Sequence, residues 1–269
     1  FAERTEFDVK AILGAKGLRH ADRGAFIFAA MMAASKLGDG SANSVTTRLG
    51  AVVGGAMPSY SSVMGILRAY QRGGPKAVPP MLVPFATVNV ASSWWMLREQ
   101  WHGFNGCPVS GDCAGLDALL WAKMQINENG IDRALAGATE GYSPELWKGL
   151  APVLGAPISE GAAAVWVDRE AYGAQAVLLR SARCFDRANP GGALERALDA
   201  LNSTAKIYRA RSRTQASVDA SAEVHSECLS VSGMLALHWA LDEIQPGEEC
   251  VVASDSRDGF ATAILLSGV

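Results

Sequence analysis

Runs of positive charge are missing from this 269-residue chain. It holds 24 Lys and Arg against 27 Asp and Glu, and the basic residues are scattered without a Lys/Arg-rich stretch. Nucleic-acid binding needs a basic patch, so its absence disfavours a nucleic-acid partner. Every apolar run is shorter than a membrane span, which needs about 20 residues. No signal peptide is recognisable, although the chain begins at Phe1 rather than Met. We therefore expect a cytoplasmic protein.

Cysteine and histidine are also scarce. The chain has 5 Cys and 4 His, and neither a C-x-x-C pair nor the ligand spacing of a metal site occurs. An odd number of cysteines without a paired spacing disfavours a disulfide framework. It is typical of free thiols in a reducing compartment. We expect no metal and no cofactor.

What the chain does have is apolar segments of two alternating kinds. Hydrophobic residues make up 49% and charged residues 19%, which suits a well-packed globular fold. Helical spacing of small and apolar residues predicts helices over 23–37, 59–70, about 94–101, 113–127, 191–207 and 229–241. Short apolar runs predict strands over 48–55, 108–110, 133–138, 162–167, 174–182, 250–253 and 261–266, with a loop or extended segment at 79–85.

Strands that are apolar on both faces and alternate with helices are typical of an α/β fold with a mainly parallel sheet. The pattern of a helix flanked by short buried strands around 112–127 repeats around 227–241. This is a faint sign of internal duplication.

The most informative stretch is residues 108–119, PVSGDCAGLDAL. It predicts a strand that turns sharply into a buried helix. It resembles the nucleophile elbow of the β-ketoacyl synthases, in which Thr/Ser-Ala/Gly-Cys precedes a helix containing Gly-Leu-Asp-Ala. When the two are registered on residues 115–119, the cysteine position of the family falls on Asp112, and Cys113 lies one residue too late.

Further blocks carry this resemblance over most of the first 170 residues. They are KGLR at 16–19, VVGG at 52–55, GGP at 73–75, PFATVN at 84–89, DRALAGATE at 132–140, SP at 143–144 and EGAAAV at 160–165. The resemblance implies a thiolase-like layered αβαβα fold in one compact unit. Residues 1–170 would form the ketosynthase-like half, and residues 171–269 a shortened second half.

The second half lacks the histidines of the family. The motif that carries the first catalytic histidine is absent, and SRTQAS at 212–217 is its nearest echo. The position of the second falls on Glu227, with His225 two residues upstream. The glycine-rich terminal loop of the family is reduced to RDGFAT at 257–262.

These losses bear on the chemistry that the resemblance implies. A condensing enzyme needs a thiolate at a helix N-terminus, together with two imidazoles that support decarboxylation. Asp112 would instead place negative charge where an oxyanion must be stabilised. The chain therefore resembles a chain-length-factor-type subunit, which is not expected to be catalytic on its own.

Such a subunit would pair as a heterodimer with an active ketosynthase in type II fatty acid, polyketide or aryl-polyene biosynthesis. It would help to shape the pocket that receives the acyl chain from an acyl carrier protein. The expected pocket residues are Phe85, Phe104 and Met124, and the expected interface residues are Trp94, Trp95 and Trp101.

Two other functions stay open. The chain could act alone as a homodimeric acyl-processing enzyme. It would then be a dehydratase, cyclase or hydrolase that uses Asp112 and Glu227, with His225 as proton donor, or an acyltransferase that uses Cys113. It could also be a non-catalytic acyl-binding or scaffolding protein.

Each candidate residue also has a plain structural explanation. Asp112 would be a helix N-cap, and Cys113 a small buried thiol, because one residue along a helix rotates a side chain by about 100°. Glu227 and His225 would be surface residues. The tryptophans would pack in the core.

Overall fold

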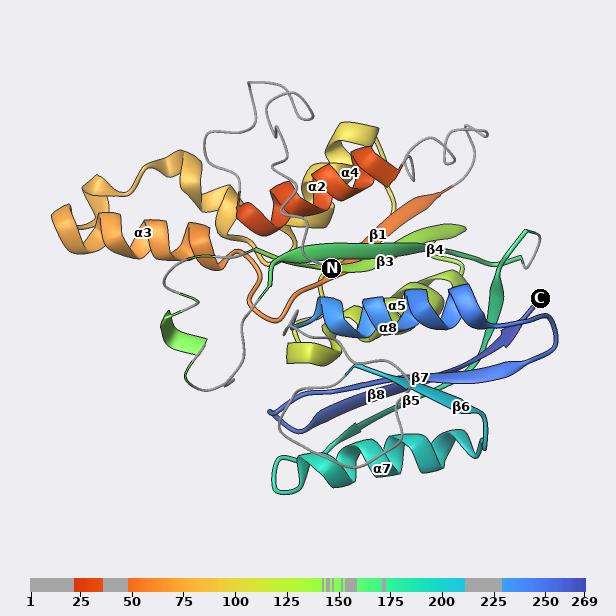
Figure 1. Cartoon of the computed structure of the whole chain (residues 1–269). Helices are drawn as coiled ribbons and strands as arrows, with labels where there is room; N and C mark the ends of the chain where they lie inside the picture. The colour runs from red at the N-terminus through yellow and green to blue at the C-terminus, as the bar shows by residue number, and fades with distance from the viewer. Residues whose placement is uncertain are drawn as a thin grey trace.

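The computed structural model describes residues 22–35, 48–141, 143, 146, 148–150, 152, 159–170, 173–210 and 229–269. Within them, two four-stranded sheets alternate with layers of helices (Figure 1). Helices α2 (Arg23–Ser35) and α4 (Val90–Glu99) lie over the outer face of the first sheet. Helices α5 (Ala114–Asn127) and α8 (Val231–Glu243) lie between the sheets, and α7 (Pro190–Leu201) covers the second sheet from outside. The predicted αβαβα order is confirmed.

The first sheet has the strand order β2-β1-β3-β4. Its strands are β1 (Leu49–Gly54), β2 (Asn105–Gly106), β3 (Arg133–Glu140) and β4 (Gly161–Asp168). Strand β1 runs parallel to β2 and β3, whereas β4 is antiparallel to β3. Between β1 and α4 the chain forms α3 (Tyr60–Gly73) and the short 3₁₀ helices η1 (Pro75–Ala77) and η2 (Pro80–Ala86).

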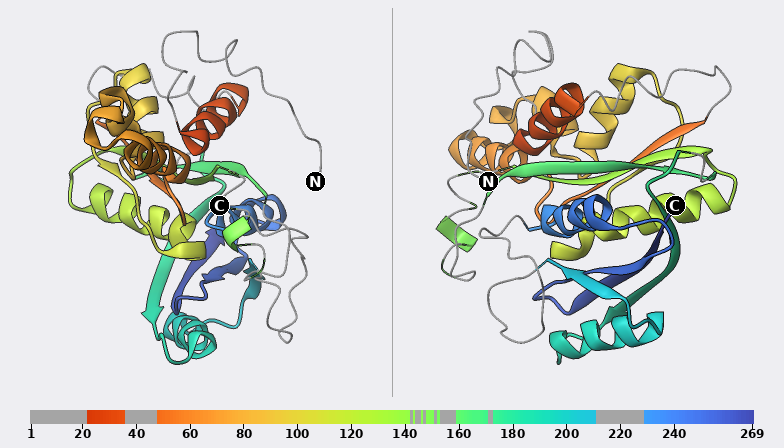
Figure 2. Two further views of the ribbon diagram at one scale, coloured as in Figure 1. Left: turned by 90° about the vertical axis from the view of Figure 1, so that its left-hand side faces the viewer. Right: turned by 45° about the vertical axis from the view of Figure 1, so that its right-hand side comes forward.

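The second sheet has the order β5-β8-β7-β6. Its strands are β5 (Ala176–Phe185), β6 (Lys206–Arg209), β7 (Glu249–Asp255) and β8 (Phe260–Gly268). Strand β6 is parallel to β7, and β8 is antiparallel to both β7 and β5. Figure 2 shows from two further sides that α7 lies beyond this sheet.

Three strands of each sheet repeat one topology. When the elements between β1 and α5 are left out, the first half has the order α2, β1, α5, β3, β4, and the second has α7, β6, α8, β7, β8. In each half the first two of these strands are parallel and the third is antiparallel to the second. The faint repeat in the sequence therefore corresponds to a repeated order of elements.

The largest apolar cluster lies between the sheets, where the inner faces of α5 and α8 meet. Leu116 and Leu119 on α5 pack in one cluster with Met234 and Leu237 on α8, and all four are buried. Both helices are apolar around most of their circumference because each is covered by a sheet and by the other helix. Neither half has a separate core in this layer.

Several local predictions are wrong. The strand expected at 108–110 is absent, and the short strand β2 lies before Pro108, which has no N–H for a ladder. The helix expected over 191–207 ends at Leu201, because Asn202 adopts a left-handed conformation and residues 206–209 pair with β7. The segment at 79–85 is 3₁₀-helical. The sheets are mixed rather than mainly parallel.

Gly54 marks the closest approach between β1 and α5. A Cβ atom on Gly54 would lie 2.2 Å from the carbonyl oxygen of Ala114, the first residue of α5. We expect Gly54→Ala to lower the free energy of unfolding by about 3 kcal/mol, because neither backbone can move away without disturbing a sheet. Urea unfolding measures this change.

Gly65 provides the matched control for this substitution. It lies within α3, and a Cβ atom there would meet nothing within 4 Å. Gly65→Ala should raise stability by roughly 0.5–1 kcal/mol through helix propensity alone. Equal effects of the two substitutions would contradict the close packing of β1 on α5.

Candidate functional site

The elbow is built as a tight turn ahead of α5. Residues Gly111–Cys113 form the 3₁₀ turn η3, and Gly111 has a φ of 58°, a left-handed conformation that favours glycine. The half-buried Asp112 follows, and its backbone oxygen accepts a hydrogen bond of 2.9 Å from Ser254 Oγ on β7. The N-cap of α5 is Cys113, so Asp112 is not its N-cap residue. Gly111 and Asp112 are half-buried, whereas Cys113 is buried.

Cys113 faces the second sheet. Its side chain is fully buried, and Sγ lies 3.3 Å from the Ser254 carbonyl oxygen and 3.4 Å from that of Phe260, to which the thiol can donate. Burial, followed by the negative charge of Asp117, raises the pKa of this thiol far above its usual range. A protonated, enclosed thiol is a poor nucleophile, so this placement argues against Cys113 as an acyl carrier.

Asp117 lies one turn further along α5 and is 1% exposed. Its Oδ2 accepts from Ser110 Oγ at 2.5 Å, and its Oδ1 accepts from Thr262 Oγ1 at 2.6 Å. The Arg183 guanidinium on β5 forms an ion pair with Oδ2 at 3.0 Å. Asp117 thus joins the elbow to two strands of the second sheet.

Glu140 ends β3 and is also buried. Its Oε1 accepts from the Ala56 backbone N–H and from Ser230 Oγ, which precedes α8. Its Oε2 has no hydrogen-bond partner among the described residues. Burial raises the pKa of this carboxyl to about 7, although the hydrogen bonds from Ser230 and Ala56 act in the opposite direction.

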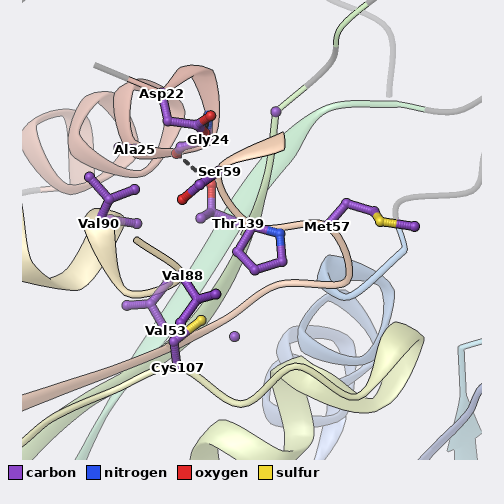
Figure 3. Close-up of a pocket in the computed structure, with 14 residues that line it drawn as sticks. Asp22, Gly24, Ala25, Val53, Met57, Ser59, Val88, Val90, Cys107 and Thr139 are labelled. Carbon is purple, nitrogen blue, oxygen red and sulfur yellow. Dashed lines mark hydrogen bonds between the residues drawn. The ribbon is translucent and has the colours of Figure 1, made fainter. Parts of the chain in front are cut away.

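A small pocket lies on the outer face of the first sheet, next to α2 (Figure 3). Its walls include the apolar side chains of Val53, Val88, Val90 and Met57 together with the Cys107 thiol. The polar groups that line it are already hydrogen-bonded within the chain. Asp22 binds the Gly24 N–H and Ser61, Ser59 donates to the Thr87 carbonyl, and Thr139 donates to the Gly24 carbonyl. The named polar groups of this pocket are therefore already paired within the chain.

Cys107 is the cysteine among the residues that line this pocket. Burial, together with the nearby Glu140, raises the pKa of its thiol to about 12. The thiol is therefore protonated at neutral pH, which disfavours nucleophilic chemistry in the pocket.

The expected pocket residues lie apart from this pocket, on separate elements. Phe85 is half-buried in η2, and Phe104 is partly buried against the core between the sheets. Met124 is 46% exposed on α5. None of the three lines the pocket in Figure 3, and their role with an acyl chain stays a prediction. Glu227 and His225 lie outside the described residues.

The three tryptophans expected at an interface pack against other residues of the first half. Trp95 is 3% exposed and Trp101 is 8% exposed, and both belong to the cluster under α2. Trp101 packs on Trp166 with ring centroids 5.3 Å apart, and Trp94 contacts Phe26 edge-on. Core packing therefore accounts for Trp95 and Trp101, while an interface role for this region stays a prediction.

Within the described ranges, no three His, Cys, Asp or Glu side chains are grouped as metal ligands would be. In the same ranges, no helix is long and apolar enough to cross a membrane.

Comparisons with known proteins give one sequence relative and several structural ones. No family model matches the chain. The chain is 27% identical over 149 residues to the 3-oxoacyl-[acyl-carrier-protein] synthase 2 of Coxiella burnetii, and the match covers 54% of this chain and 36% of the relative. The chain thus spans about a third of the length of that relative.

Solved structures match nearly the whole chain. A chain of the ishigamide ketosynthase/chain length factor aligns with a TM-score of 0.82 at 22% identity, covering 98% of this chain and 86% of that one. A chain from the complex of a type II polyketide synthase acyl-carrier protein with its ketosynthase aligns with a TM-score of 0.76 at 17% identity. The match covers 98% of this chain and 89% of that one. A β-ketoacyl synthase from Burkholderia phymatum gives 0.75 at 15% identity, with 100% and 86% covered.

The chain has the thiolase-like fold of the β-ketoacyl synthases.

In this ketosynthase-like chain, sequence reasoning missed two buried acids, Asp117 and Glu140. A signal for each is visible in the sequence, because both interrupt segments of small and apolar residues. A charged residue on the buried face of such a segment is rare unless it is paired or hydrogen-bonded.

Proposed function

We propose that the chain is a non-condensing ketosynthase-like subunit of the chain-length-factor type. It pairs with an active β-ketoacyl-ACP synthase in type II fatty acid, polyketide or aryl-polyene biosynthesis. In that complex it helps to bound the space for the acyl chain carried by an acyl carrier protein, and it forms no covalent bond with that chain.

The observation that carries this proposal is the mismatch between the elbow and its side chains. The turn and its buried helix are well formed, yet position 112 bears a carboxylic acid. The adjacent thiol of Cys113 is buried and directed into the second sheet. An elbow with this arrangement supports packing and pocket formation rather than acyl transfer through a thioester.

A surface suited to a partner lies on residues 57–88, which we call the arm. It runs through α3, η1 and η2, and α3 extends away from the two sheets (Figure 1). Along α3, the side chains of Val63, Leu67 and Tyr70 follow one helical face and are 37%, 47% and 55% exposed. In η2, Met81 is 64% and Val83 is 55% exposed.

Apolar exposure of this extent is typical of an interaction surface. The charge of the arm adds a second condition on its partner. The arm contains Arg68, Arg72 and Lys76 but no Asp or Glu, although the whole chain carries a net charge of −3. A partner surface with apolar side chains and acidic residues at its edge would complement it.

The edge of the first sheet supports the same pairing. Among the described residues, strand β2 is paired on one side only, with β1, and Val109 just beyond it is 51% exposed. An unpaired edge can accept a strand from another chain. We propose that the arm and this edge together contact the ketosynthase.

The test is co-expression with a ketosynthase encoded beside this chain, followed by size-exclusion chromatography and mass spectrometry. We expect a one-to-one complex, and Leu67→Asp together with Met81→Asp should weaken it by about tenfold or more, because both place charge in an apolar contact. Leu179→Asp is the matched control, since Leu179 is 42% exposed on β5 of the second sheet, outside the arm. In an intact complex, Asp112→Ala should leave product formation nearly unchanged.

A monodisperse monomer that ignores the ketosynthase would contradict the proposal. A homodimer that processes an acyl substrate by itself, and loses turnover with Asp112→Asn while keeping its fold, would instead support a stand-alone enzyme.

A further inference from the structure

We propose that Asp117 is a positioning residue that holds the elbow turn through Ser110 and so determines what position 112 presents at the start of α5. The inference concerns the frame of the elbow and does not depend on the proposed function.

Asp117 is fixed from the side of the second sheet. Thr262 on β8 is fully buried and donates to Oδ1 at 2.6 Å. Arg183 on β5 contacts Oδ2 at 3.0 Å and lies over the Phe260 ring at 4.9 Å. A buried carboxylate with a hydroxyl donor on one oxygen and a guanidinium on the other has little freedom to rotate.

Ser110 is the link from this carboxylate to the turn. It is 3% exposed, and its hydroxyl donates to Asp117 Oδ2 at 2.5 Å. Its carbonyl oxygen accepts from the Cys113 N–H at 3.2 Å, which closes the turn around Gly111 and Asp112. Ser110 therefore holds the turn by its backbone and is itself held by its side chain.

The conformation of the turn depends on glycine at its first position. Gly111 has a positive φ, and a Cβ atom there would lie 3.0 Å from Ser256 Cβ. The second sheet supports the other end of the turn, where Ser254 Oγ donates to the Asp112 carbonyl oxygen at 2.9 Å. Without the Ser110 side chain, the contacts of Asp112 and Cys113 with Ser254 would still hold the turn to the second sheet, but its hydrogen bond to Asp117 on α5 would be lost.

A thiol placed at position 112 can report on this geometry. In Asp112→Cys the introduced side chain would lie at the N-terminus of a 14-residue helix, where a thiolate is stabilised. Its rate of alkylation by iodoacetamide, followed against pH, gives a thiol pKa and a plateau rate. Peptide mass spectrometry assigns the modified residue, and the native chain provides the background from its own cysteines.

In the Asp112→Cys background, Ser110→Ala should slow alkylation at pH 7 by about tenfold, because it releases the turn without removing a charge. It should also move the thiol pKa toward that of a free cysteine. Thr262→Val is the matched control. It removes one hydroxyl bond from the same carboxylate but leaves Ser110 in place, so it should change the rate by less than about threefold. Ser110→Thr, which keeps the hydroxyl, should restore the rate.

Three outcomes would overturn the proposal. They are an unchanged rate in Ser110→Ala, an equal slowing in Thr262→Val, and a Ser110→Thr protein that is as slow as Ser110→Ala. If Ser110→Ala does not fold, Asp117→Ala replaces it, because it removes the acceptor of the Ser110 hydroxyl, and it is read at the high-pH plateau where the thiol is fully ionised. A lower plateau than in Asp112→Cys alone supports the proposal, and an equal plateau rejects it.

Discussion

Glu140→Gln is expected to stabilise the protein relative to the native chain at pH 8 and to lose that advantage at pH 5. The Glu140 carboxyl is buried, and burial raises its pKa from an ordinary value of 4.5 to about 7. Between these two values the folded chain holds a proton that the unfolded chain has released. Stability is therefore greatest at low pH and falls as the pH rises through 7.

The size of this effect follows from the two pKa values. Between pH 5 and pH 8 the native chain should lose roughly 2–3 kcal/mol of folding free energy at this one group. In Glu140→Gln the amide oxygen can still accept from Ala56 and Ser230, and the neutral side chain does not titrate. The difference in stability between the variant and the native chain should therefore change by this amount across the pH range.

Urea unfolding at both pH values measures that difference. Glu195→Gln is the control for removing a carboxylate, because Glu195 is exposed on α7. A Glu140→Gln effect that is independent of pH would show that Glu140 does not take up a proton on folding.

Asp255→Ala should be among the most destabilising single changes in the second half. Asp255 on β7 and Arg209 on β6 form an ion pair at 2.9 Å, and their side chains are only 13% and 11% exposed. The Arg209 guanidinium donates to Asp255 Oδ1 through both Nε and a terminal nitrogen. Removing the carboxylate would leave a largely buried guanidinium without this partner, at a cost of about 3–5 kcal/mol.

Asp132→Ala is the comparison for this loss. Asp132 also pairs with an arginine, Arg48, at 2.9 Å, but both side chains are well exposed to water. Exposed pairs contribute little to stability because water and salt screen them. Thermal unfolding should show a much smaller decrease in Tm for Asp132→Ala, and equal decreases would mean that burial does not strengthen the Arg209–Asp255 pair.

Several helices could be predicted because small and apolar residues recur along their whole length. Helix α5 begins within one residue of its expected start, since small and apolar residues persist along its whole length. Strand β6 was missed for the opposite reason. Its four residues form a strand through pairing with β7, in a register that joins Lys206 to Cys250, and no local pattern reveals a partner so far along the chain.

The elbow shows the same division between local and distant information. Its position and the mismatch at Asp112 follow from the resemblance of residues 108–119 to the family motif, which lies within one segment. The Asp117 network could not be predicted, because Thr262 and Arg183 approach it from another sheet, far away in the sequence. Glu140 likewise depends on Ser230, which belongs to the other half of the molecule.

The shared layer of α5 and α8 has a consequence for synthesis on the ribosome. Helix α8 begins at Val231, long after α5 ends at Asn127, so α5 emerges well before the helix that covers its inner face. At ordinary elongation rates this interval lasts roughly 5–20 s. During that time the nascent first half exposes the apolar side of α5, which makes it a candidate for chaperone binding until the second half is complete.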